Sequence, residues 1–344
     1  GLSGRAMVGP DGTAARRFLV TGGAGFIGSH VVDTLIDRGD AVIVLDNLDT
    51  GTIENIPDAI AIDPKDVFDI TGGMIGFIEG SILDVEVLGH LVPSVDGIIH
   101  LAAIASVERC QDDPVLDRSV NFDGLRKIMM LSASIENPRP VVFSSSAAVY
   151  GEPTDLPITE SDSTTPISNY GVSKLDAERL ITEGDGIVPS TAFRFFNVYG
   201  PRQDPSSPYS GVISVFIARA LGGQPLRIDG DGEQSRDFIH VSDIVQGLLH
   251  GLDALLINGI SAKGHAEVYN LCSENQLSIL NLADEVERHI VRKIERTSGP
   301  ARPGDIRHSV GSSSRAHKDL GFKCSITFSE GLGNLIDSFQ SAEG

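Results

Sequence analysis

Arg17-Phe18-Leu19-Val20-Thr21-Gly22-Gly23-Ala24-Gly25-Phe26-Ile27-Gly28 is the stretch that decides the fold. Its first five residues are mostly apolar and predict a short buried strand, which runs straight into a group of glycines. After the glycines, apolar residues recur at helical spacing (Val31, Val32, Leu35, Ile36), and Gly39 can end the helix in a left-handed cap. A helix that begins at a glycine turn offers unpaired amides and the positive end of its dipole. The stretch therefore predicts a seat for a phosphate group.

The glycines fit a dinucleotide site in either of two registers. Gly23, Gly25 and Gly28 match the G-x-G-x-x-G pattern, and Gly22, Gly25 and Gly28 are also regularly spaced. A second strand is predicted over 41–45, and it ends in Asp46, eighteen residues beyond Gly28. A carboxylate at this point pairs with ribose hydroxyls and repels a 2′-phosphate. The pattern predicts that NAD, rather than NADP, is bound.

A second group of residues predicts the chemistry. Tyr170 and Lys174 are four residues apart, so in a helix they share one face, and we expect the ammonium to lower the pKa of the phenol. The run 143–151 contains three serines at the end of another predicted strand, and Ser146 can hold the same substrate oxygen as Tyr170. A phenol with a lowered pKa is a usable proton acceptor near neutral pH. On its own, a Tyr-Lys pair at this spacing is more often an exposed helix pair, and the glycine turn supplies the context that favours a site.

The order of elements predicts an α/β fold with a doubly wound parallel Rossmann sheet. Apolar runs suited to strands occur at 17–21, 41–45, 75–78, 97–101, 140–144 and 191–196, with helical or loop material between them, including long helices over 115–135 and 169–183. We expect residues 1–16 to be a flexible tail or a remnant of cloning. Residues 17–196 would form mainly the NAD-binding domain. Residues 197–340, richer in Pro and Gly, would form mainly a smaller substrate-binding lobe, with some segments returning to the sheet.

Composition narrows the possible partners. The chain has 344 residues, 41% of them hydrophobic, and no apolar run near the roughly 18 residues that cross a bilayer. We expect a soluble, cytoplasmic protein. The net charge of −20 argues against nucleic acid as a partner, so an anionic substrate must be met by local arginines, for which Arg236, Arg302 and Arg307 are candidates. The acidity fits either a high-salt habitat or sequence drift.

The sequence predicts no metal site and no disulfide. Cys110, Cys272 and Cys324 are widely spaced, and the nine histidines form no ligand pattern. We expect ordinary buried thiols and a packing role for His100 and His240, which each end an apolar run.

Taken together, these motifs resemble the extended short-chain dehydrogenase/reductases, and within them the NAD-dependent nucleotide-sugar epimerases of the UDP-glucose/UDP-N-acetylglucosamine 4-epimerase type. The resemblance covers about 17–325. It is carried by 21–28, 45–48, 100–103, 144–151, 170–174, 194–202, 230–240 and 302–309. It implies a homodimer that retains NAD and supplies a UDP-sugar, for example to polysaccharide biosynthesis.

The resemblance also implies a role for each site residue. Tyr170 would take the proton of the sugar 4-hydroxyl, Ser146 would hold that oxygen, and Lys174 would bind the ribose and tune Tyr170. The NAD site would include Gly22, Gly25, Phe26, Ile27, Gly28, Asp46, Asn47, Ser81, Ile82, Leu101, Ala102, Ala103, Asn121 and Phe196. Ser81 stands where relatives usually carry Asp, which weakens the bond to adenine. The UDP-sugar would be held by Asn197, Val212, Arg236, Arg302 and Asp305.

The residues that follow Ser146 help to predict which reaction is catalysed, and residue 309 helps to predict which sugar is accepted. Relatives that dehydrate or decarboxylate the sugar carry acidic residues in the run where this chain has Ala147 and Ala148, so 4-epimerisation is favoured. Ser309 replaces a bulky tyrosine of some relatives and would admit a 2-N-acetyl group, as the segment 205–210 also suggests. We expect UDP-GlcNAc/UDP-GalNAc, with UDP-Glc/UDP-Gal also accepted. The alternatives are a 4-epimerase of UDP-glucuronic or UDP-N-acetylhexosaminuronic acid, a nucleotide-sugar dehydratase, a net dehydrogenase and a non-catalytic NAD sensor.

Overall fold

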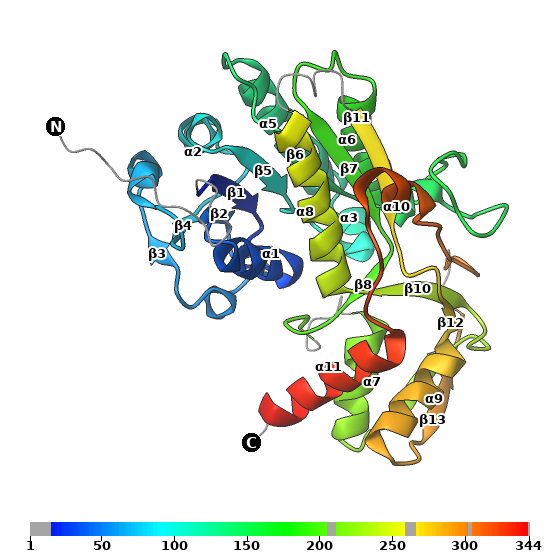
Figure 1. The fold of residues 1–344 in the computed structure, drawn as a ribbon. Helices are drawn as coiled ribbons and strands as arrows, with labels where there is room; N and C mark the ends of the chain where they lie inside the picture. Colours follow the sequence, from blue (N-terminus) through cyan, green and yellow to red (C-terminus); the bar gives the residue numbers. More distant parts are fainter. Residues whose placement is uncertain (1–14, 205–210, 259–265, 302–304, 343–344) are drawn as a thin grey trace.

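A parallel sheet of eight strands forms the centre of the computed structural model, which describes residues 15–204, 211–258, 266–301 and 305–342 (Figure 1). The strand order is β11-β7-β6-β5-β1-β2-β4-β3, and every neighbouring pair is parallel. The strands are β1 (Arg17–Thr21), β2 (Ala41–Asp46), β3 (Ile60–Ala61), β4 (Ile75–Glu79), β5 (Gly97–His100), β6 (Val141–Ser146), β7 (Ser190–Phe195) and β11 (Ala266–Leu271). The predicted doubly wound sheet is confirmed, because each of the six predicted strands is present to within two residues.

Helices cover both faces of this sheet, which explains why the central strands β1 and β2 are apolar and buried along almost their whole length. On one face lie α1 (Phe26–Asp37), α8 (Val241–Asn258) and α10 (Ser314–Leu320), whose apolar side chains join those of Phe18 and Val20 in one core. On the other face, α2 (Val85–Leu91), α5 (Gly124–Ala133) and α6 (Asn169–Thr182) bury their apolar residues against Leu19 and Ile43. Strand β1 is therefore fixed from both sides.

The helix predicted over 115–135 consists of three pieces. It begins as α4 (Pro114–Arg118), continues as a π-helical segment over Ser119–Asp123, and ends as α5. The wider π turn changes the direction of the side chains, and Asn121 within it is 2% exposed. Helix α3 (Val107–Asp112) precedes these pieces, and short 3₁₀ turns occur at Ile53–Asn55, Pro64–Asp69, Val92–Ser94 and Ala147–Tyr150.

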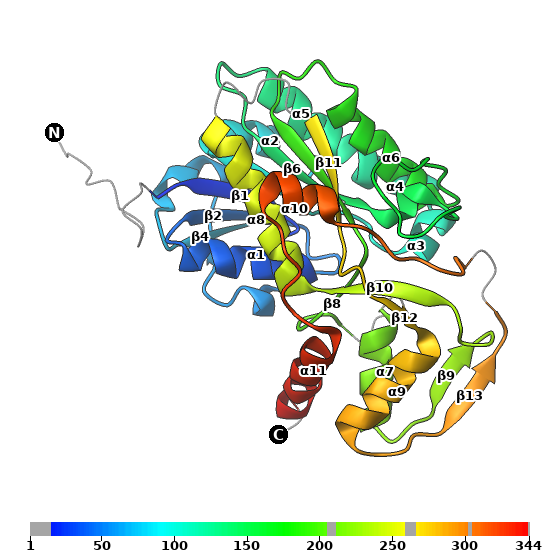
Figure 2. The same ribbon diagram turned by 45° about the vertical axis from the view of Figure 1, so that its right-hand side comes forward.

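The remaining elements form a smaller group at one side of the sheet (Figure 2). They comprise β8 (Asn197–Tyr199), β10 (Ser235–His240) and β12 (Gln276–Ser278) in one small sheet, β9 (Leu226–Asp229) with β13 (Arg296–Gly299) in another, and the helices α7 (Val212–Leu221), α9 (Ile279–Ile290) and α11 (Phe328–Ala342). These helices share a core with Leu226 and Phe238. The carboxylate of Asp237 ties β10 to the segments that follow it, because it accepts hydrogen bonds from the amides of Ser273, Glu274 and Gly311.

The strand order changes direction at β1. Strand β2 lies on one side of β1, and β5, which follows later in the chain, lies on the other. In open parallel sheets, ligands bind at the carboxyl ends of the strands at such a point. Within the described ranges, the structure holds no helix with the length and apolar character of a membrane span.

Candidate active site

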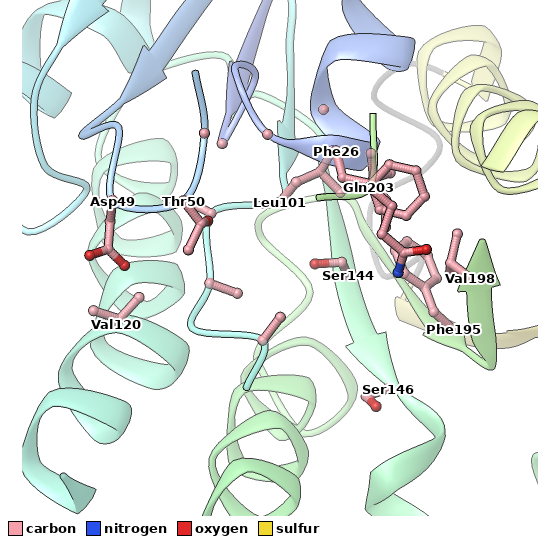
Figure 3. A pocket seen from close by; sticks show the side chains of 18 of the residues that line it. Phe26, Asp49, Thr50, Leu101, Val120, Ser144, Ser146, Phe195, Val198 and Gln203 are labelled. Atoms are coloured by element: carbon pink, nitrogen blue, oxygen red, sulfur yellow. The ribbon is translucent and has the colours of Figure 1, made fainter. Parts of the chain in front are cut away.

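A cavity of about 480 Å³ opens at the carboxyl ends of the sheet strands (Figure 3). It lies between the sheet and the smaller group of elements, because residues of β8, α7 and β10 also line it. The figure shows Ser144 and Ser146 on β6, with Asp49 and Thr50 on one side and Phe26, Val198 and Gln203 on the other. The cavity is therefore the place where the predicted site residues can be compared with the structure.

The glycine turn after β1 brings the backbone close to the cavity. Gly22 has φ +70°, and a Cβ there would lie 2.8 Å from the amide nitrogen of Ala102. A Cβ on Gly28 would lie 2.0 Å from the carbonyl oxygen of Gly22, so these two glycines are pressed together. Gly23 instead faces the side chain of Val44. Of the two registers, the one formed by Gly22, Gly25 and Gly28 makes the close backbone approaches.

The turn leaves the start of α1 free for an anion. Gly25 is the N-cap of this helix and brings no side chain to its first amides. Gly25, Phe26 and Ile27 line the cavity. Exposed amides and the helix dipole together suit the pyrophosphate of a dinucleotide.

Asp46 ends β2 beside this turn and is only 7% exposed. Its Oδ2 accepts a hydrogen bond of 3.0 Å from the amide of Ala24, and its Oδ1 accepts one of 2.9 Å from the amide of Leu48. Burial raises the pKa of the carboxyl, and these two bonds oppose the rise. The carboxylate is thus fixed at the edge of the cavity, where ribose hydroxyls can reach it.

Ser146, Tyr170 and Lys174 also line the cavity. Ser146 is the last residue of β6, and its Oγ accepts a hydrogen bond of 3.1 Å from the amide of Ala148. Ser168 is the N-cap of α6, and its Oγ accepts a hydrogen bond from the amide of Gly171. The helix therefore begins at Asn169, directly before Tyr170. The Nζ of Lys174 donates to the carbonyl oxygen of Ser144 at 2.8 Å and lies 5.8 Å from the centre of the Tyr170 ring.

The expected lowering of the Tyr170 pKa was wrong for the protein as the structure describes it. Burial raises the pKa of Tyr170 to about 12, and a hydrogen bond with Ser146 opposes this rise, while the nearby Cys110 and Asp117 add to it. Burial also lowers the pKa of Lys174 to about 8. Desolvation is therefore the dominant influence on the Tyr170 pKa, and the Lys174 ammonium donates its hydrogen bond to the Ser144 carbonyl.

A buried network supports this side of the cavity from below. Arg194 of β7 forms a salt bridge with Glu178 of α6, and both side chains are at most 6% exposed. Glu178 also accepts a hydrogen bond of 2.8 Å from Ser145, and Arg194 donates one of 2.9 Å to the hydroxyl of Tyr150. The network holds β6, β7 and α6 in register beneath the three predicted catalytic residues.

An ion pair joins the loop that follows β2 to helix α3, which comes after β5 in the chain. Asp49, which lines the cavity, is bonded to both terminal nitrogens of Arg109 on α3, with one distance of 3.1 Å. Because β2 and β5 flank β1, this bridge links the segments that follow the two neighbours of β1.

Comparisons with known proteins agree with this geometry. A sequence model described as the NAD dependent epimerase/dehydratase family matches residues 18–272. The chain belongs to this family. It is 33% identical to UDP-glucose 4-epimerase of Mycolicibacterium smegmatis, over 94% of this chain and 99% of that protein. It is also 36% identical to UDP-N-acetyl-alpha-D-glucosaminuronate decarboxylase of Bacillus cytotoxicus, over 79% of this chain and 80% of that protein.

A solved epimerase structure has nearly the same fold. The UDP-N-acetylglucosamine 4-epimerase of Methanobrevibacter ruminantium M1, in complex with UDP-N-acetylmuramic acid, superposes with a TM-score of 0.83. The two chains are 33% identical, and the match covers 95% of this chain and 99% of that one. The cofactor of the family is NAD, and the close backbone at Gly22 and Gly28 and the fixed carboxylate of Asp46 fit it.

The structure brings most of the predicted site residues to the cavity. Those that line it are Gly22, Gly25, Phe26, Ile27, Gly28, Asp46, Asn47, Ser81, Ile82, Leu101, Ala102, Ala103, Ser146, Tyr170, Lys174, Phe196, Asn197 and Val212. Asn121 lies behind the wall instead. Its side chain accepts from the amide of Ile104 and donates to the carbonyl oxygen of Ile104, each at 3.0 Å. It therefore shapes the wall without facing the cavity.

Fewer of the residues predicted to bind the UDP-sugar line the cavity. Arg236 forms a salt bridge with Asp305. Ser309 is 8% exposed, and its amide donates to the carbonyl oxygen of Ser235. Arg236, Asp305 and Ser309 are not among the described residues that line the cavity. Arg307 holds the exposed Asp231 through two bonds of 2.7 and 2.9 Å. Arg302 and the segment 205–210 lie outside the described residues.

His100 and His240 are packed, as predicted. His100 is 1% exposed, and its Nδ1 lies 2.7 Å from the Thr21 hydroxyl oxygen; burial lowers its pKa to about 3. His240 is 8% exposed and lies edge-on to the Tyr199 ring.

Sequence reasoning missed other residues of the cavity wall. Asp49, Thr50 and Gly51 lie three to five residues beyond Asp46, the last residue of β2, and this position near the carboxyl end of the strand was a usable signal. Gln203 and Phe238 also line the cavity, but they come from segments that only the folded chain brings there.

Proposed function

We propose that this protein catalyses NAD-dependent 4-epimerisation of a UDP-hexose. The observation that carries this proposal is that Ser146, Tyr170 and Lys174 line the same cavity as the glycine turn and Asp46. NAD, when bound, supplies the acceptor and later the donor of a hydride. The residues of the chain must then handle one proton and hold the sugar.

We assign the proton of the sugar 4-hydroxyl to the deprotonated phenol oxygen of Tyr170, which takes it on oxidation and returns it on reduction. Because burial raises the pKa of Tyr170 to about 12, only a small fraction of the phenol is in this base form near pH 7, and turnover should increase with pH. Ser146, to which Tyr170 is hydrogen-bonded, is placed to hold the same sugar oxygen. Lys174 lies close enough to both Tyr170 and the cavity to bind a ribose hydroxyl. Return of hydride to the other face of the transient ketone inverts the configuration without net redox change.

The absence of acidic residues in the stretch after Ser146 favours epimerisation over related reactions. Ala147 and Ala148 begin a short 3₁₀ turn and carry no titratable group. Dehydration and decarboxylation need further proton transfers at the sugar, for which a positioned acid or base is required. The chain is nevertheless 36% identical to a decarboxylase, so product analysis must include release of CO₂.

For the sugar, we propose UDP-GlcNAc/UDP-GalNAc, with UDP-Glc/UDP-Gal also accepted. Similarity to both a UDP-glucose and a UDP-N-acetylglucosamine 4-epimerase supports this pair. Ser309 lies away from the described cavity wall, so the small residue at this position offers the N-acetyl group less support than we expected.

The test is to incubate the purified protein with UDP-GlcNAc, UDP-Glc or UDP-glucuronic acid, without added NAD and then with it, and to follow the 4-epimer by proton NMR. We expect both neutral sugars to be converted, and Tyr170→Phe to lose at least about 100-fold in kcat while still binding NAD. Conversion of UDP-glucuronic acid alone would favour a uronic acid epimerase. Loss of sugar with formation of CO₂ or a 4-keto-6-deoxy product would contradict epimerisation.

The homodimer and the cytoplasmic location stay predictions of the resemblance. A second copy would have apolar surface to cover on α4, α5 and α6, where Val115, Met130 and Val172 are 77%, 60% and 43% exposed. Sedimentation equilibrium would show whether the chain forms this dimer.

A further inference from the structure

A buried carboxylate that the mechanism above does not use lies beside the predicted catalytic residues. Asp117, near the end of α4, is 2% exposed. Its Oδ1 accepts a hydrogen bond of 2.7 Å from the Nδ2 of Asn121, and its Oδ2 accepts one of 2.7 Å from the Oγ of Ser173. Among the described residues, no side chain of Lys, Arg or His makes an ion pair with it. A buried carboxylate in this state is costly and needs a compensating role.

The hydrogen bonds of Asp117 with Ser173 and Asn121 lead to different parts of the cavity lining. Ser173 is the residue before Lys174 and lies one helical turn from Tyr170, so this bond fixes the turn of α6 that carries both. Asn121 holds both backbone groups of Ile104 and thereby the segment 101–105, in which Leu101, Ala102, Ala103 and Ala105 line the cavity. Asp117 therefore joins the predicted catalytic wall to the predicted cofactor wall.

The charge of Asp117 also reaches the reacting groups. Burial is the largest influence on Lys174 and lowers its pKa to about 8, but Cys110 and Asp117 oppose this and favour the ammonium. For Tyr170, burial raises the pKa most, and Asp117 adds to the rise. Both effects have the same origin, because a negative charge in a desolvated site favours a bound proton on each neighbour.

We propose that Asp117 is a positioning residue of the reaction: its carboxylate locks the Tyr170–Lys174 turn to the 101–105 segment and serves as the buried counter-charge of Lys174. The inference rests on the proposed function for its catalytic meaning, but its physical content can be measured without a substrate. Asp117 itself does not line the cavity.

The variant that isolates the charge is Asp117→Asn, which has nearly the same shape. Its amide oxygen can still accept from Asn121 and its amide nitrogen can donate to Ser173, so the hydrogen bonds can be kept while the charge is lost. Ser173→Ala does the reverse, because it removes one bond and keeps the carboxylate. Asp123→Asn is the matched control, since Asp123 lies six residues further on and pairs only with Arg126 on the surface among the described residues.

The first readout is the titration of Lys174 by NMR of lysines labelled with ¹³C at Cε, assigned with Lys174→Arg. The chain has seven lysines, so the spectrum is simple. In Asp117→Asn we expect the Lys174 midpoint to fall by about half to one pH unit. In Asp123→Asn it should not move. An unchanged midpoint in Asp117→Asn would overturn the counter-charge role.

The second readout is the pH profile of kcat for the UDP-sugar that the wild type converts. Asp117→Asn should move both limbs toward lower pH, because the pKa values of Tyr170 and Lys174 fall together. Ser173→Ala should keep the limbs in place and lose several-fold in kcat at every pH. Full activity in Ser173→Ala, or a loss in Asp117→Asn with no shift of either limb, would contradict positioning.

The two hypotheses fail in different ways. If the wild type converts no UDP-sugar, the proposed function fails, while the NMR titration still decides whether Asp117 sets the charge of Lys174. If Asp117→Asn does not fold, Ser173→Ala still tests the link to α6 through kcat and through the affinity for NAD, which should fall as the two walls separate.

Discussion

Lys174 is a residue whose burial in the predicted active site lowers the free energy of unfolding of the protein. It is 2% exposed, and within the part of the chain that the structure describes its ammonium donates one hydrogen bond, to the Ser144 carbonyl. Burial lowers its pKa from 10.5 to about 8, so near pH 7 the folded protein carries a buried ammonium that the unfolded chain would hydrate.

Lys174→Met should therefore abolish turnover and raise the free energy of unfolding by about 1–3 kcal/mol at pH 7. Between about pH 8 and pH 10.5 the unfolded wild type binds more protons than the folded form, so wild-type stability rises with pH and the gap to the variant closes. Urea unfolding at pH 7 and pH 10 measures both effects. The exposed Lys65→Met serves as control, and a variant less stable than wild type at pH 7 would refute this account.

Single residues also mark the limit of what sequence reasoning can predict. Spacing alone placed Tyr170 and Lys174 on one helix face, and the structure confirms that both line the cavity. The direction of the Tyr170 pKa shift depends on how completely the phenol is desolvated, and burial by distant segments cannot be derived from a four-residue spacing. The same holds for Asp117, whose partners lie on two other elements.

At the scale of elements, the turn between β1 and α1 was predictable because strand, glycines and helix are adjacent in the chain. The choice of register was not, since it depends on contacts with Ala102 and Val44, which lie on neighbouring segments. The π-helical segment over Ser119–Asp123 was missed for a related reason, because one extra residue per turn leaves no clear mark in the apolar spacing.

Gly28→Ala tests the turn directly. An added Cβ would lie 2.0 Å from the carbonyl oxygen of Gly22, so the turn must open and NAD affinity should fall at least about tenfold, or roughly 1.4 kcal/mol. Gly89→Ala is the matched control, because Gly89 is exposed on α2 with nothing within 4 Å of the new methyl group. We expect this control to gain about 0.5–1 kcal/mol in helix stability with unchanged NAD binding, as calorimetry can show. Equal NAD affinity in both variants would argue against a tight turn.

The pair of Glu178 and Arg194 joins α6 to β7, and no local pattern predicted it. Glu178→Gln leaves the Arg194 guanidinium buried without its counter-charge and should cost about 3–5 kcal/mol of unfolding free energy in urea. Glu183→Gln, on the exposed end of the same helix, should change it by less than about 0.5 kcal/mol. A loss of similar size in both variants would mean that the buried pair has no special role.

At the scale of the whole molecule, the dominant feature is the net charge of −20. Like charges spread over one surface repel each other and favour the expanded chain. The predicted parallel sheet forms in spite of this, because its strands are buried on both faces and the charges remain outside.

We expect added KCl, up to about 1 M, to raise the melting temperature, since the Debye length falls to about 3 Å and the repulsion is screened. The effect should shrink near the isoelectric point of about 4.7, where the net charge is small. Scanning calorimetry at pH 7.5 and pH 5 makes the comparison. A melting temperature that falls with salt at pH 7.5 would show that attractive ion pairs outweigh the repulsion.

The ion pair between Asp49 and Arg109 suggests that salt also affects how long NAD stays bound. Its side chains are 41% and 31% exposed, and an exposed ion pair weakens as ionic strength rises. Asp49 lines the cavity, so we expect the bridge to slow the release of NAD. NAD should then dissociate faster as KCl is added, and Arg109→Gln should release NAD fast at every concentration. Salt would then prolong the life of the fold while shortening the life of the holoenzyme, and a cell that changes its internal salt would change how often this protein must be reloaded.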